Sequence, residues 1–325
     1  PYRRQVISNV DRFIPCGHQD AAQIARTVEA GGIDILIDVM GFTTGHRLDL
    51  FALRSAPIQL NYLGYPGTTG ASFIDYVVAD PVILPFDQSE YFSEKIVHLP
   101  DCYQPNATGF DVGARPRRAD YDLPEDAVVL CSFNNLNKLD PATFDSFCRI
   151  LTAVPRSVLW MLSRSAEAEA NLRREAEQRG VAGGRLMFAP PEPMERHLAR
   201  MPLADLFLDS FPYTAHTTAS DAVRMGLPLV TRTGRTFASR VAASVLHCAG
   251  LDDLVTTSAH AFEQCATVLA LDPDRLKAVR ARVETAVSTS ALFDPHRYAR
   301  NIEAAFATMV ARYEAGLPPS AFAVP

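Results

Sequence analysis

Short apolar runs and amphipathic stretches alternate along the second half of the chain. Apolar runs fall at 127–133, 157–162, 185–189, 204–208 and 227–231, and helical periodicity falls at 141–153, 166–179, 194–201 and 217–225. Apolar runs of this length between turns are typical of buried parallel strands, and the stretches between them suit crossover helices. One more helix is expected at 237–248, ending before Gly250. This half therefore predicts a doubly wound parallel sheet.

The first half shows the same alternation with less regularity. A helix is expected at 21–30, strands are expected at 33–39 and 73–79, and a further apolar run lies around Ile58. Glycines at 64, 67 and 70 surround Pro66, so 63–70 is expected to be a loop with unusual backbone freedom. The pattern of the first half therefore also predicts an α/β layer.

Two features divide the chain. Residues 111–120 are rich in Arg, Pro and Gly, which is typical of a linker, and they separate an expected domain at 1–110 from one at 121–285. A last helix begins at Asp294-Pro295 and carries one apolar stripe, formed by Tyr298, Ile302, Ala305, Phe306, Met309 and Tyr313. We expect this C-terminal segment, 286–325, to pack back across the domains.

Charge and hydropathy exclude two classes of partner. The 325 residues carry a net charge of -6 and no long Lys/Arg cluster, so we expect no nucleic-acid partner. No apolar run reaches the roughly 18 residues of a membrane span, so no membrane partner is expected. The chain starts Pro1-Tyr2-Arg3-Arg4, which is neither a signal peptide nor a natural initiation site, so we expect an excised piece of a longer protein.

The cysteines and acidic pairs give no metal signature. Six cysteines, at 16, 102, 131, 148, 248 and 265, form no Cys-x-x-Cys pair and no zinc-type spacing with His. We expect reduced, mostly buried thiols and a cytoplasmic protein. Asp-x-Asp occurs at 120–122 and 272–274, but both pairs lie away from the expected ligand edge, so no metal is expected.

The most informative motif is His216-Thr217-Thr218, which stands between the apolar run at 204–208 and the helix at 217–225. The first N–H groups of a helix lack intrahelical partners and lie at the positive end of its dipole, so they attract phosphate. The two threonines add hydroxyl donors, His216 adds an imidazole, and Asp221 offers acceptors for a ribose diol. The alternative is that Thr217 or Thr218 only caps the helix.

Two further groups follow other strands of the same sheet. Lys138 lies between the strand at 127–133 and its helix, where it can neutralise a leaving diphosphate, or be an ordinary solvated lysine. His197 lies early in the helix after the strand at 185–189, where it can stack on a base, or be a surface residue. Because the carboxyl ends of parallel strands meet at one edge, we expect Lys138, His197 and the His216 triplet to converge.

Several common enzyme classes lose support because their motifs are missing. The chain has no Gly-x-Gly-x-x-Gly after a strand, no Walker lysine, no Gly-x-Ser-x-Gly and no His-Glu-x-x-His. The dinucleotide, ATP, acyl-transfer and zinc-protease interpretations are therefore not supported.

With these residues in view, the chain resembles the catalytic region of the O-linked N-acetylglucosamine transferase and Spindly family, which is glycosyltransferase family 41. The resemblance covers nearly the whole chain. The blocks that carry it are Gly41-Phe42-Thr43, Phe51-Ala52-Leu53-Arg54, Ala56-Pro57-Ile58-Gln59, the segment 63–70, Tyr91 to Lys95, Phe133-Asn134 with Lys138, Ser157-Val158-Leu159-Trp160, His216-Thr217-Thr218 and Ala238-Ser239-Arg240-Val241-Ala242.

The resemblance implies an α/β fold of GT-B type, in which two Rossmann-like domains face a cleft and the second holds a nucleotide sugar. Here the first, acceptor-side domain at 1–110 is incomplete, since the family's first strand and its tetratricopeptide repeats would precede Pro1. The implied reaction is inverting, metal-independent transfer of a sugar from a UDP-sugar donor, without a cofactor, to Ser or Thr of a protein acceptor. N-acetylglucosamine from UDP-N-acetylglucosamine is the sugar expected first.

Residue roles follow from the same resemblance. Lys138 and His216 are the implied catalytic residues, with His216 near the sugar–phosphate junction. The implied donor-binding residues are Asn135, His197, Arg200, Thr217, Thr218 and Asp221, with His197 packing on the uracil. Gly64, Tyr65, Pro66 and Gly67 are the implied loop lining the sugar and the acceptor.

Three departures leave the donor open. Met194 stands where animal members carry a nucleotide-contacting lysine, Asn135 replaces a glutamine beside the phosphates, and Tyr62 replaces a tryptophan before the loop. A family histidine of the early segment is also absent here. The alternatives are therefore GDP-fucose or UDP-glucose as donor, and a catalytically degenerate scaffold domain. A phosphoglycosyl epimerase also uses this architecture and is the last alternative, since more acidic groups would be expected at the cleft.

Overall fold

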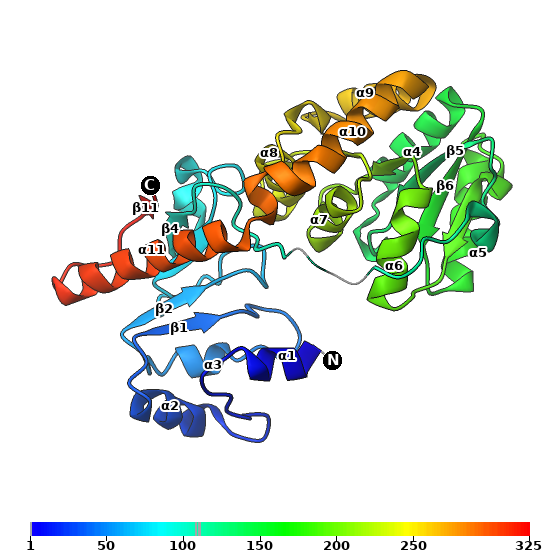
Figure 1. The fold of residues 1–325 in the computed structure, drawn as a ribbon. Coiled ribbons are helices and arrows are strands. Elements are labelled where there is room, and N and C mark those ends of the chain that lie inside the picture. Colours follow the sequence, from blue (N-terminus) through cyan, green and yellow to red (C-terminus); the bar gives the residue numbers. More distant parts are fainter. Residues whose placement is uncertain (1, 108, 110–111) are drawn as a thin grey trace. The chain divides into compact units, whose positions relative to one another are not determined.

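The computed structural model describes residues 2–107, 109 and 112–325 (Figure 1). Among these residues the chain forms two sheets, and every registered strand pair in them is parallel. The six cysteines are free, and three of them are buried. No helix of the described residues is both long and apolar enough to cross a membrane.

The first sheet has the strand order β1-β2-β3-β4-β11. Its strands are β1 (Ile35–Asp38), β2 (Ile58–Asn61), β3 (Tyr76–Ala79), β4 (Lys95–His98) and β11 (Phe322–Ala323). The strand expected at 73–79 is shorter than the prediction, because Ile74 N donates to Ala71 O and closes a turn there (3.2 Å).

The second sheet has the order β10-β9-β8-β5-β6-β7. Its strands are β5 (Val128–Ser132), β6 (Ser157–Leu162), β7 (Leu186–Ala189), β8 (Leu206–Leu208), β9 (Leu229–Arg232) and β10 (Val255–Thr256). The chain runs outward from β5 through β6 to β7 and then returns to β8 on the other side of β5. This reversal of direction beside β5 is the switch point at which ligands bind in doubly wound sheets.

The helices have from four to twenty residues, and several begin at an Asp or Ser whose side chain accepts a backbone N–H. They are α1 (Tyr2–Ser8), α2 (Ala21–Ala30), α3 (Leu48–Phe51), α4 (Pro141–Ala153), α5 (Ala166–Gln178), α6 (Met194–Arg200), α7 (Thr217–Arg224), α8 (Val241–Cys248), α9 (Ala259–Leu271), α10 (Pro273–Thr289) and α11 (Pro295–Glu314). The helix expected at 237–248 is divided. A 3-10 turn, Phe237–Ser239, precedes α8, because the Ser239 hydroxyl bonds back to Thr236 and Arg240 leaves the helical conformation (φ -120°).

The described residues form two compact units. The first contains 2–78, 90–95 and 306–321, and its core includes Ile24, Leu50, Phe51 and Ile74. The second contains 79–89, 96–305 and 322–325, without the undescribed positions, and buries Trp160, Phe147 and Phe207. The expected linker at 111–120 begins at Asp111, which lies outside the described residues, and the domain boundaries given above stay a prediction.

Candidate active site

The candidate site lies in the second unit, in the segments that follow β5, β7 and β8. Lys138 ends the 3-10 turn Leu136–Lys138 after β5, His197 lies in α6 after β7, and His216 directly precedes α7 after β8. Polar side chains at the carboxyl ends of neighbouring parallel strands share one edge of a sheet. The sheet order therefore sets Lys138 and His216 at the switch point between β5 and β8, while β7 lies two strands beyond β5. His197 is tied to the end of β5 by the contact of its ring with Phe133 (5.4 Å).

Lys138 is in direct contact with the loop that leads to His216. Its Nζ donates to the carbonyl oxygen of Thr214 (3.1 Å) and lies 4.2 Å from the centre of the Tyr213 ring. Burial lowers the pKa of the Lys138 ammonium, and the nearby carboxylate of Asp209 opposes this effect. The interpretation of Lys138 as a solvated surface lysine is therefore wrong.

His216 is held as a neutral ring. It stacks on Tyr213, with the ring centres 4.7 Å apart, and its Nε2 lies 3.4 Å from the carbonyl oxygen of Ala238. Burial, together with the positive charge of Lys138, lowers the pKa of His216 to about 3. At neutral pH this imidazole therefore carries no charge. It has one N–H donor and one nitrogen acceptor, so one of them can serve a ligand.

The start of α7 lies where the sequence predicts a phosphate-binding helix start, and phosphate binding itself stays a prediction. Thr217 and Thr218 are the first two residues of the helix, and their N–H groups precede the first intrahelical donor, Ala219 N, which bonds to His216 O (2.9 Å). The N-cap residue is His216, which makes no side-chain capping bond. The interpretation in which a threonine only caps the helix is therefore wrong, and both hydroxyls remain at the helix start.

Asp221, one turn into α7, is mostly buried and forms an ion pair with Arg224 (2.5 Å). Burial raises the pKa of its carboxyl group, while Arg224 opposes that shift. The pair leaves the carboxylate with remaining lone pairs, because a carboxylate can accept about four hydrogen bonds. Its assignment to a ribose diol stays a prediction.

His197 rests on a fully buried arginine. Arg200 has no exposed surface, donates to His197 Nδ1 (2.8 Å) and donates to the carbonyl oxygen of Pro190 (2.8 Å). The His197 ring also meets the edge of Phe133, with ring centres 5.4 Å apart. Burial, with the charge of Arg200, lowers the pKa of His197 to about 4. Arg200 therefore acts beneath His197, as a support for the ring.

Sequence reasoning missed the carboxylate that organises this edge. Asp209 follows β8, is fully buried and accepts four hydrogen bonds, from Asn134 Nδ2 (2.8 Å), Ser210 N (2.8 Å), Ala215 N (2.7 Å) and Thr231 Oγ1 (2.6 Å). These bonds fix the loop between β8 and α7 against the ends of β5 and β9. Its only sequence signal is a charged residue directly after an apolar strand.

A family model of glycosyl transferase family 41 matches residues 1–107 and 108–302. The chain belongs to glycosyl transferase family 41. It is 35% identical over 99% of its length to a probable UDP-N-acetylglucosamine–peptide N-acetylglucosaminyltransferase, SEC, of Arabidopsis thaliana, of which it covers 34%. It is 32% identical over 93% of its length to the SPINDLY protein of Solanum lycopersicum, which carries the same probable activity in its name, and covers 32% of it. The chain thus spans about a third of these relatives.

Solved structures agree with the family and the fold. The O-GlcNAc transferase of Thermobaculum terrenum superposes with a TM-score of 0.89 at 30% identity, covering 95% of this chain and 59% of that one. Sucrose-phosphate synthase of Thermosynechococcus elongatus matches with a TM-score of 0.62 at 14% identity, covering 92% of this chain and 81% of that one, which concerns the fold alone. The fold is of the GT-B type.

The glycine-rich loop of this family 41 chain lies in the first unit and is described there by itself. Tyr65 meets Phe42 edge to face at 5.4 Å, and Pro66 and Gly67 follow it, half-buried. Glu94 anchors the end of the loop by accepting from Thr68 Oγ1 (2.6 Å) and from both the amide and the hydroxyl of Thr69. The end of the loop is therefore held by hydrogen bonds to a buried carboxylate.

Gly64 has the tightest surroundings in this loop, and we expect Gly64→Ala to destabilise the protein by about 2 kcal/mol. A Cβ there would stand 1.8 Å from the carbonyl oxygen of Val39, so the backbone must move. Gly67→Ala is the matched control, because its Cβ would meet only the movable Tyr65 ring at 3.3 Å. Chemical denaturation of both variants measures the difference, and equal stabilities would contradict the steric argument.

Both site imidazoles are expected to stay neutral through the physiological range. With pKa values of about 3 and 4, His216 and His197 should show no protonation step between pH 5.5 and pH 8. Histidine ring signals followed by NMR, and assigned with His216→Gln and His197→Gln, measure this directly. A midpoint near pH 6.5 for either ring would contradict the buried, cation-facing environment.

Asn135 is exposed next to Lys138, and its side chain accepts from Asn137 N (3.2 Å). This bond caps the 3-10 turn that carries Lys138, which is itself closed by the bond from Lys138 N to Asn135 O (2.9 Å). Asn135 therefore shapes the turn, and its role beside the phosphates stays a prediction. Met194, the first residue of α6, is 40% exposed at the position where the resemblance leads one to expect a lysine.

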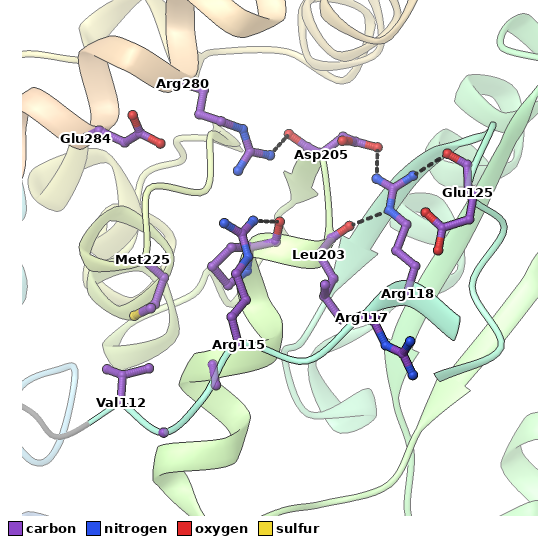
Figure 2. A pocket seen from close by; sticks show the side chains of 13 residues that line it. Val112, Arg115, Arg117, Arg118, Glu125, Leu203, Asp205, Met225, Arg280 and Glu284 are labelled. Carbon is purple, nitrogen blue, oxygen red and sulfur yellow. Dashed lines mark hydrogen bonds and ion pairs between the residues drawn. The ribbon is translucent and has the colours of Figure 1, made fainter. Parts of the chain in front are cut away.

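A cavity of about 850 Å³ lies at the opposite edge of the second sheet, where β5 and β8 begin (Figure 2). Its arginines already bind protein atoms: Arg115 (2.9 Å), Arg118 (3.1 Å) and Arg280 (2.7 Å) each donate to a carbonyl oxygen of residues 202–204. Arg118 also pairs with Asp205 (2.7 Å). The arginines of this cavity therefore hold segments of the protein together, away from the candidate site. Its other charged residues, Arg117, Glu125 and Glu284, have both signs.

Proposed function

We propose that this family 41 chain carries the donor-binding half of a protein glycosyltransferase, which transfers N-acetylglucosamine from UDP-N-acetylglucosamine to Ser or Thr with inversion. The observation that carries the proposal is the contact between the Lys138 ammonium and the loop that opens α7. It sets a fixed positive charge beside a helix N-terminus. The names of the relatives SEC and the Thermobaculum terrenum O-GlcNAc transferase support the donor and the peptide acceptor.

The chemistry requires stabilisation of the leaving group. When an acceptor hydroxyl attacks the anomeric carbon, a new carbon–oxygen bond forms and the hydroxyl proton is released to water. The bond from that carbon to the phosphate oxygen breaks, and its electron pair stays on UDP. Lys138, the N–H groups of Thr217 and Thr218, and their hydroxyls meet that growing negative charge. Preorganised donors of this kind stabilise the transition state because they need no reorganisation as the charge develops. We propose that these groups supply the charge without a metal ion.

The remaining donor contacts are assigned by position. We propose that His197 packs on the uracil, since its ring is neutral and firmly supported, and that Asp221 binds the ribose. Asn135 stands at the phosphate side with Lys138. His216, neutral and next to Lys138, is proposed to contact the oxygen between sugar and phosphate. Tyr65, with Gly64, Pro66 and Gly67, is proposed to line the sugar and acceptor.

Differential ligand binding tests the proposal. We expect UDP and UDP-N-acetylglucosamine at 100 times their Kd to stabilise the full-length protein by about 2.7 kcal/mol, while GDP and GDP-fucose leave its melting temperature unchanged. A GDP-selective shift would replace the proposal by fucosyl transfer. No shift with any of the four would favour a degenerate scaffold, for which Met194 in place of lysine is the supporting observation.

Transfer itself is measured with a Ser/Thr peptide mixture and mass spectrometry. UDP-N-acetylglucosamine is expected to add one N-acetylhexosamine per site, and UDP-glucose supplied at the same concentration should add little hexose. Equal or greater transfer from UDP-glucose would move the sugar assignment to glucose. Transfer with retention of anomeric configuration, read by NMR of the glycopeptide, would contradict the inverting reaction.

A further inference from the structure

Tyr213 occupies the centre of the candidate site although neither the sequence analysis nor the relatives' names assign it a role. It lies in the loop between β8 and α7, and 36% of its surface is exposed. Its backbone carbonyl oxygen accepts from the Ser210 hydroxyl (2.8 Å). This bond holds the loop from the backbone side.

Both proposed catalytic residues contact that ring. The Lys138 Nζ lies 4.2 Å from the ring centre, within cation–π distance, and the His216 imidazole stacks on the ring at 4.7 Å with an interplanar angle of 23°. The charge of Lys138 also contributes to the lowered pKa of His216. One aromatic side chain thus connects the cation and the neutral imidazole.

The Lys138 side chain is restrained mainly by its contacts with residues 213 and 214 of this loop. Among the described residues its one hydrogen bond goes to the carbonyl oxygen of Thr214, the residue directly after Tyr213. A lysine side chain loses up to about 2 kcal/mol of conformational entropy when fixed. The ring face covers one side of the ammonium and so reduces the number of orientations it can adopt before a ligand binds.

We infer that Tyr213 is a positioning residue of the donor site, which holds the Lys138 ammonium and the His216 ring in the arrangement that receives the diphosphate. The inference rests on the proposed function and deepens it. The role is assigned to the aromatic ring, which makes both contacts. Tyr213→Phe keeps the ring, and Tyr213→Leu removes it while keeping an apolar side chain.

A double-mutant cycle tests the coupling in the full-length protein. Wild type, Tyr213→Leu, Lys138→Ala and the double variant are compared by the Kd for UDP and by kcat/KM for UDP-N-acetylglucosamine. We expect Tyr213→Leu to weaken both about tenfold on its own. In the Lys138→Ala background the same change should have less than a twofold effect, because a residue that acts through Lys138 has nothing left to position.

The controls separate this inference from a general loss of structure and from failure of the proposed function. Tyr213→Phe should keep both parameters within about threefold, and the ligand-free melting temperatures of Tyr213→Leu and Tyr213→Phe should agree within about 2 °C. Equal losses in both Lys138 backgrounds, or a Tyr213→Phe variant as impaired as Tyr213→Leu, would overturn the positioning role. If wild type binds no UDP, the proposed function fails before the cycle is read.

Discussion

Replacing Lys138 by alanine is expected to lower kcat for transfer from UDP-N-acetylglucosamine by about 10²- to 10³-fold. The Lys138 ammonium is half-buried and in contact with the loop that opens α7. In such a site a positive charge stabilises a leaving diphosphate more than it does in water. Steady-state kinetics in the full-length protein measures the loss, and the Kd for UDP shows how much of it is ground-state binding.

Lys277→Ala is the matched control for this prediction. Lys277 is exposed on α10 and makes no hydrogen bond or ion pair within the described residues. Its loss removes the same charge from the chain and should leave kcat within about twofold of wild type. A Lys138→Ala variant with more than half of the wild-type kcat would remove Lys138 from the catalytic group.

Replacing Asp209 by alanine is expected to lower the free energy of unfolding by about 3 kcal/mol. The change leaves four donors without an acceptor inside the protein, and relief of a buried charge offsets part of the cost. For a unit of this size the melting temperature should fall by about 6–12 °C. Asp126→Ala is the control, since its pair with Arg156 is exposed and contributes little.

The same carboxyl group makes a pH-dependent contribution with a defined sign. Burial raises the pKa of Asp209 from 3.8 to about 6, against the effect of its hydrogen bonds. The folded state therefore binds a proton that the unfolded state has already lost. This contribution to stability is fully present below pH 3.8 and is lost as the pH rises through about 6. Denaturation series of wild type and Asp209→Asn should therefore diverge in slope between these pH values, and parallel series would contradict the raised pKa.

The elements with a strong local signal could be predicted from the sequence. The helix at 141–153 and the strand at 157–162 have the bounds of α4 and β6, because Asp140-Pro141 gives a capped helix start and the strand is a continuous apolar run. The helix at 21–30 likewise has the bounds of α2, which starts with a capping box at Asp20. Local chemistry determines these boundaries.

Other elements have no such signal. The strand β10 has two residues, and its pairing with β9 follows from the path of the chain. The strand β11 is equally short. A two-residue strand is too short to show an alternation of apolar and polar side chains, so β10 could not be predicted. The 237–248 stretch is mostly apolar with Ser239 and Arg240 near its start, and its division depends on the Ser239 hydroxyl, which bonds back to Thr236.

Some residues of the candidate site could likewise be predicted from the sequence, and others could not. Lys138, His197 and His216 could be found because each follows a strand of one parallel sheet, and such ends converge whatever the sequence between them. Asp209 and Tyr213 could not be assigned, since their roles depend on partners far away in the sequence, such as Asn134 and Lys138. Arg200 was expected at the ligand and lies fully buried beneath His197.

The bond between Arg200 and His197 also determines which ring nitrogen carries the proton. A guanidinium only donates, so Nδ1 of His197 must be the accepting, unprotonated nitrogen. With a pKa of about 4 the ring holds one proton at neutral pH, and that proton resides on Nε2. The free edge of the imidazole is therefore an N–H donor, and a ligand atom that approaches Nε2 has to be a hydrogen-bond acceptor.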